Sequence, residues 1–179
     1  HTSTQAHEQK GKVMSIAVQG LQFGLKKNLD WAQRLTADLS PEQMTLQPPG
    51  DRPAPVNHPA WIFSHLNVYL PVMAGLLRGE TFEDPKFHPF GMQSKPEADA
   101  SVYASKEDLL KAWNAGHEEL ARLLSTATDA TLLQPVTLPR WREIMPTAGI
   151  VVPYLLLVHE NQHLGQLSAW RRVLGLPPV

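Results

Sequence analysis

The chain has 179 residues, which suits one domain with a buried core. It carries 16 Lys plus Arg against 17 Asp plus Glu, so no basic surface for nucleic acid and no acidic tail is expected. Cysteine is absent, which excludes thiol nucleophiles, iron–sulfur ligation and disulfides and is compatible with a reducing compartment. We therefore expect a cytoplasmic protein.

No apolar run approaches the ~18 residues of a membrane span, so no membrane partner is expected. The longest run, residues 149–158, leads straight into a polar histidine segment and is interpreted as the start of a buried helix. Residues 1–12 are interpreted as a disordered or artificial lead-in, and residues 13–179 as a single domain.

The first helix is predicted over residues 13–39, and Pro41 ends it. Its apolar positions recur every three or four residues: Leu21, Leu25, Leu29, Ala32, Leu35 and Leu39. A proline-rich linker follows. The second helix is predicted to begin at Pro59, with His58 just outside it, and to end at Gly79. Pro71 predicts a bend within it.

An irregular connection over residues 79–104 precedes a third helix that starts at Ser105. The next connection, residues 126–147, contains the strand-like "QPVTLPRW", which could form a short extended pair. The fourth helix is predicted over residues 148–174, with Pro153 in a bent or loosely wound start and Gly175 at its end. The fold class is therefore all-α: a four-helix bundle with long irregular connections.

One face of the fourth helix is apolar at both ends and polar in the middle. At helical spacing this face carries Val152, Leu156, His159, His163, Gln166, Trp170 and Val173. Burying unpaired imidazoles costs about 1–3 kcal/mol each, so these histidines need partners. Two readings stay open: hydrogen bonds to side chains and water, or a shared metal ion, since residues four apart can converge on one ion.

A third ligand should come from another helix. His65 is the best candidate, because it lies mid-helix on an apolar stripe with Ile62, Tyr69, Val72 and Leu76. His117, beside two glutamates, is expected to face water or the bundle edge. Three neutral imidazoles hold a divalent ion and leave positions open, as in a reactive site.

Residues 159–163 also read H-E-x-x-H, the signature of zinc peptidases. The extended form of that motif fails, because Gln166 stands in place of glycine and Ala169 in place of histidine. The residues after His163 contain no Asp, Glu or His to complete the site. We therefore interpret Glu160 as a supporting or surface residue and rank a metallohydrolase low.

The aromatic residues are expected to pack in the core or at an interface, and not to form an aromatic binding site on which a ligand stacks. These residues are Trp61, Trp113, Trp141 and Trp170. Trp141, with Arg140 or Arg142, lies in a connection and could also edge a pocket. The apolar content of the bundle suggests a homodimer.

The stretches "AWIFSHLNVY" around His65 and "HENQHLGQLSAWRRVLGLPP" from His159 resemble the DinB-like family, which includes bacillithiol S-transferases and mycothiol-dependent maleylpyruvate isomerases. The resemblance implies one divalent metal, zinc or nickel with iron as a further option, bound by His65, His159 and His163. Gln166, Glu160 and Tyr69 are expected beside the metal or in its pocket.

The resemblance further implies a small-molecule partner, a low-molecular-weight thiol whose pKa the metal lowers for attack on an electrophile. A metal-binding or stress-related module without catalysis is the alternative. No thiol-binding motif is identified in the sequence.

Overall fold

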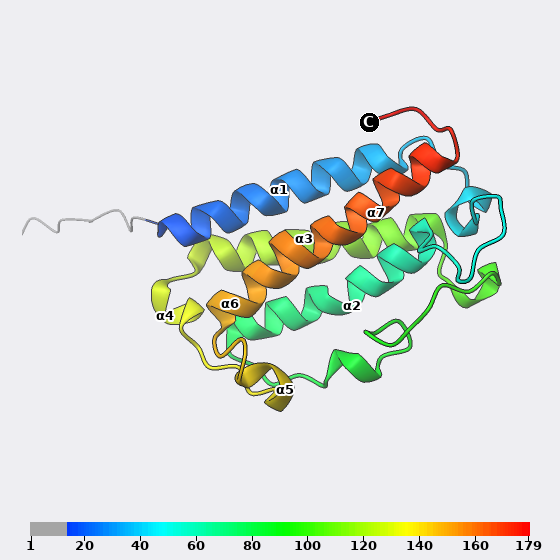
Figure 1. The fold of residues 1–179 in the computed structure, drawn as a ribbon. Coiled ribbons are helices and arrows are strands. Elements are labelled where there is room, and N and C mark those ends of the chain that lie inside the picture. The colour runs from blue at the N-terminus through cyan, green and yellow to red at the C-terminus, as the bar shows by residue number, and fades with distance from the viewer. Residues whose placement is uncertain (1–13) are drawn as a thin grey trace, which may run out of the picture.

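The computed structural model describes residues 14–179, so the lead-in expected at residues 1–12 lies outside the described residues. Four long helical runs form a bundle (Figure 1). They are α1 (Ile16–Thr36), α2 (Pro59–Arg78), α3 (Lys106–Thr126) and a composite fourth run of α6 (Ala148–Pro153), the π-helical segment η4 (Tyr154–His159) and α7 (Glu160–Val173). The all-α prediction is confirmed, and the predicted bounds differ from the observed ones by only a few residues.

The connections contain short helical turns that the sequence analysis did not predict. They are η1 (Glu42–Thr45), η2 (Pro85–Phe87), η3 (Ala100–Val102), α4 (Asp129–Leu132) and α5 (Pro139–Arg142). Within residues 14–179 no strand forms, and the expected extended pair is reduced to one isolated bridge between Pro135 and Thr147.

Local sequence signals explain where the long helices begin and end. Ser15 and Ser105 cap α1 and α3, since their hydroxyls accept the backbone N–H three residues on. His58 caps α2 through a ring nitrogen that accepts the Trp61 N–H at 3.2 Å. Helix α2 ends at Gly79, whose φ of 71° is a left-handed conformation that glycine adopts without strain.

The core lies between the four runs, and α2 and α3 are in close contact along it. Gly116 on α3 allows this approach, because a Cβ there would lie 2.5 Å from Leu70 Cδ1 on α2. The four tryptophans expected to pack in the core are all buried, at 5 % exposure or less. Pro71 lies inside α2 without interrupting it.

Helix α2 corrects the expectation that no segment is apolar enough for a membrane span. Its 18-residue window has a mean hydropathy of 1.4, which passes that test by length and composition. However, 83 % of the window is buried inside the bundle. A core helix buried on most sides is apolar all round for that reason.

Two connections lie on the same side of the bundle, below α2 in Figure 1. They are residues 79–105 and the segment that carries α5. The Arg140 guanidinium on α5 joins them through three hydrogen bonds to the Asp84 carboxylate, at 2.7–2.9 Å. Together they form a wall beside α2 and the fourth helical run.

Candidate metal centre

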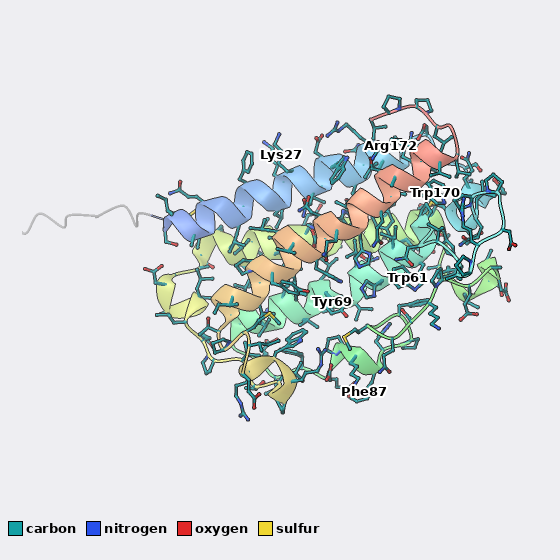
Figure 2. The ribbon with its side chains drawn as sticks, viewed as in Figure 1. Lys27, Trp61, Tyr69, Phe87, Trp170 and Arg172 are labelled. Carbon is teal, nitrogen blue, oxygen red and sulfur yellow. The ribbon has the colours of Figure 1, made fainter. Side chains whose placement is uncertain are left out.

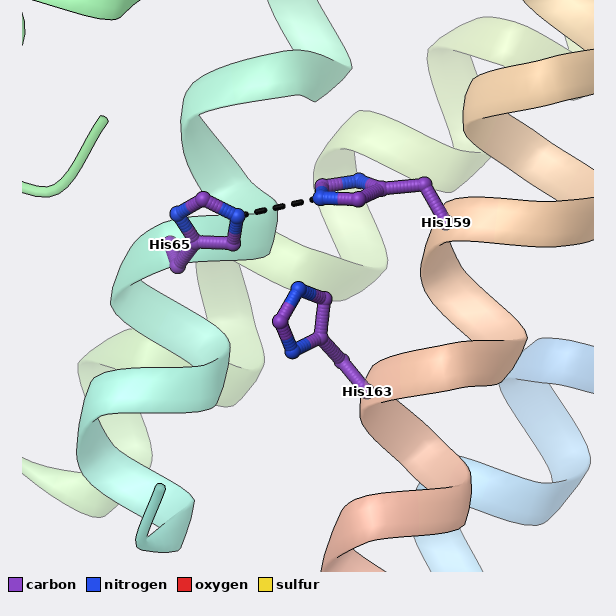
Figure 3. A group of neighbouring side chains, drawn as sticks. All are labelled: His65, His159 and His163. Carbon is purple, nitrogen blue, oxygen red and sulfur yellow. Dashed lines mark hydrogen bonds between the residues drawn. The ribbon is translucent and has the colours of Figure 1, made fainter. Parts of the chain in front are cut away.

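Three histidines from two helices meet inside the bundle. His65 projects from α2, His159 is the last residue of η4, and His163 follows one turn later on α7; Figure 3 shows their rings turned toward one another. One ring nitrogen from each lies within 4.8 Å of the other two. The fold therefore brings together the three residues predicted as ligands, in an arrangement that can hold a metal ion.

The separation of the ring nitrogens suits shared coordination. His65 Nε2 lies 3.0 Å from His159 Nε2. Two nitrogens about 2.0–2.1 Å from a tetrahedral zinc would stand about 3.3 Å apart. A small side-chain adjustment would be enough to place both on one ion.

Hydrogen bonds fix which nitrogen faces the centre. His65 Nδ1 lies 2.7 Å from the Phe90 carbonyl oxygen, and His163 Nδ1 lies 2.9 Å from Gln166 Oε1. Both oxygens are acceptors, so both Nδ1 atoms donate and the Nε2 lone pairs are left for a metal. The Trp61 indole stacks on the His65 ring, 4.8 Å between centroids and 8° from parallel, and holds its plane.

The electrostatics favour the neutral imidazoles that metals bind. Burial, together with the neighbouring histidines, lowers the pKa of His159 to about 3 and that of His163 to about 4. Burial also lowers the pKa of His65. In addition, His159 Nδ1 is buried without a hydrogen-bond partner among the described residues. The donor set, its tautomers and its protonation state all fit a divalent ion.

A pocket of about 700 Å³ opens over the three histidines. Trp61 and Tyr69 of α2 form one side, and Figure 2 shows both on that helix. Arg140 and Trp141 of α5 form another side, so Trp141 is both buried and at the pocket edge. Burial raises the pKa of Tyr69, which therefore stays protonated at neutral pH. An open pocket gives a small molecule access to the metal positions that protein ligands leave free.

Glu160 lies on the other side of the helix from this pocket. It is 2 % exposed, and its Oε2 accepts hydrogen bonds from Asn28 Nδ2 on α1 at 2.7 Å and from His117 Nε2 on α3 at 3.2 Å. The expectation that His117 faces water is wrong, because its side chain is 0 % exposed. The carboxylate thus supports the bundle interior and is not directed at the three histidines, which argues against a peptidase-type base.

The π-helical turn explains how Asn28 enters this network. The Glu160 N–H bonds to the Leu155 carbonyl five residues back instead of the Leu156 carbonyl four back. The Leu156 oxygen accepts a hydrogen bond from Asn28 Nδ2 at 2.7 Å. Such π-turns occur often at functional sites, and this one ends at His159. The sequence predicted a bent or loosely wound start containing Pro153; the structure has a regular first turn and places a π-turn directly after Pro153.

The face predicted for the fourth helix is correct only in part. Val152, Leu156 and Trp170 are buried, but Val173 is 57 % exposed and Gln166 is also exposed. Gln166 reaches His163 from the rim of the site, and its Oε1 also accepts a hydrogen bond from the Asn57 side chain at 3.0 Å. It therefore contacts His163 from a solvent-facing position and not from the core face predicted for it.

Three contributors to the site were missed or underrated by the sequence analysis. Asn28 carried a signal, since it occupies a core-facing position between Leu25 and Ala32 at helical spacing. Arg140 had been named only as a residue that could edge a pocket. The Phe90 carbonyl had no signal, because backbone groups carry no side-chain identity.

Comparison with known proteins agrees with this geometry. A comparison with curated proteins gave no match. The family model described as the DinB superfamily matches residues 25–167, which include all three histidines and most of the bundle. The protein therefore belongs to the DinB superfamily.

Proposed function

We propose that the protein binds one divalent metal ion through His65, His159 and His163 and uses it to activate a low-molecular-weight thiol for attack on a small electrophile. The observation that supports this most is the convergence of three neutral imidazoles at an open pocket. Zinc or nickel suits three imidazoles best, and iron is a further option. Family membership supports metal binding and leaves the substrate to be found.

Different residues of the site would have different roles in this reaction. A metal bound here would lower the pKa of a thiol or water that occupies an open position. The three histidines supply ligands, and Phe90 and Gln166 fix two of the rings. The protonated Tyr69 hydroxyl lines the same pocket and can donate a hydrogen bond to a bound substrate.

Metal analysis of the purified protein tests the first half of the proposal. We expect about one equivalent of zinc or nickel per chain after loading and dialysis, and strong loss of it in His159→Ala. Gln162→Ala is the matched control, because Gln162 is exposed and lies between the two ligands in sequence. Trace metal in the wild type, or equal uptake by His159→Ala, would exclude the site.

Turnover tests the second half. Metal-loaded protein is incubated with a thiol and monochlorobimane, and bimane adduct formation is followed by fluorescence. A rate above background that is lost on chelation and in His159→Ala supports the transferase. Stoichiometric metal without turnover for several thiols would instead favour the non-catalytic metal-binding alternative.

A further inference from the structure

Arg140 is the charged residue in the lining of the pocket over the three histidines. Its side chain is 29 % exposed, so the guanidinium is partly shielded from bulk water. It also lies over the Trp141 ring, with Cζ 4.7 Å from the ring centroid. The cation is thereby held in one place at the pocket wall.

Asp84 fixes the guanidinium and leaves part of it free. Nε and Nη2 donate to the two carboxylate oxygens at 2.7–2.9 Å. Nη1 makes no hydrogen bond within the described part of the chain. The atom is also not fully buried. Asp84 itself lines a different cavity and does not line the pocket over the histidines. An anchored arginine with a free edge is a preorganised receptor for an oxyanion.

Apart from the three histidines and the hydroxyls of Tyr69 and Tyr154, the rest of the lining is apolar or aromatic and includes Trp61, Met92, Ile144, Met145 and Leu155. A volume of about 700 Å³ is in the range that accommodates small organic ligands. Apolar walls with one cation select a molecule that has an apolar body and one anionic group.

We infer that this pocket binds a small organic anion with an apolar or aromatic body, whose carboxylate or sulfonate is held by Arg140 Nη1. This deepens the proposed function, because it names the substrate class of the same site. Arg140 is then a specificity-determining residue and not a metal ligand. Anion recognition by Arg140 does not require the metal, so the two proposals can fail separately.

A matched pair of fluorescent probes tests the inference in the metal-free protein. 8-Anilinonaphthalene-1-sulfonate carries a sulfonate, and N-phenyl-1-naphthylamine has the same aromatic body without charge. We expect Arg140→Gln to weaken binding of the sulfonate on the order of tenfold, the effect of one charge-assisted hydrogen bond, and to leave the neutral probe unchanged. Arg142→Gln, at an exposed neighbouring position, is expected to alter neither.

Asp84→Asn separates recognition from a structural role. If Arg140 binds the anion, this variant keeps or tightens sulfonate binding, because the cation loses its carboxylate partner. If Arg140 only ties the two connections together, Asp84→Asn and Arg140→Gln weaken both probes alike, which overturns the inference. Equal sulfonate binding by wild type and Arg140→Gln, or equal losses in Arg140→Gln and Arg142→Gln, also overturns it. Metal uptake and turnover, measured separately, decide the proposed function.

Discussion

Replacing Glu160 by methionine should destabilise the bundle strongly while removing little volume. The substitution leaves the side-chain N–H of Asn28 and Nε2 of His117 without their acceptor, in surroundings 0–2 % exposed. Each unpaired buried group costs about 1–3 kcal/mol, so the two donors together cost about 2–6 kcal/mol. For a chain of this size we expect a fall in Tm of roughly 10 °C.

Thermal unfolding followed by circular dichroism measures this loss. Glu118→Met is the matched control, since Glu118 is exposed on α3, and its Tm should stay at the wild-type value. Replacing Asn28, His117 and Glu160 together by leucine should recover much of the stability, because no polar group is then left unpaired. A wild-type Tm for Glu160→Met would refute this account of the network.

Three further predictions concern other parts of the chain. Arg171→Met should cost about 1–3 kcal/mol in chemical denaturation, because the 2 % exposed guanidinium donates to the Leu35 carbonyl and pairs with the half-exposed Asp38, whereas exposed Arg172→Met should leave stability unchanged. Gly116→Ala should cost about 1–3 kcal/mol by overpacking, while Gly20→Ala, with nothing within 4 Å, should gain about 0.5–1 kcal/mol; equal effects would contradict the packing. The metal-free protein should be less stable to urea at pH 5.5 than at pH 7.5. The three site histidines have pKa values below 6.5 in the folded protein, so the unfolded state binds more protons as the pH falls through 6.5. The free energy of unfolding therefore drops by up to about 1.4 kcal/mol per pH unit for each histidine. Equal stability at both pH values would argue against the burial of these histidines as neutral groups.

The sequence by itself determined the long helices and the central part of the site. Helical periodicity and caps are local signals, so α1, α2 and α3 were located within a few residues. The i, i+4 spacing of His159 and His163 is also local, and the apolar stripe of α2 identified His65 as the third candidate.

Only the tertiary structure decided what those residues contact. The neighbours of His117 in sequence are charged, yet it packs inward because Glu160 and the Trp113 carbonyl satisfy its two ring nitrogens. Contacts between Arg140 and Asp84, 56 residues apart, follow from how two irregular connections fold over α2. Such pairings depend on long-range geometry, which periodicity along a single segment does not encode.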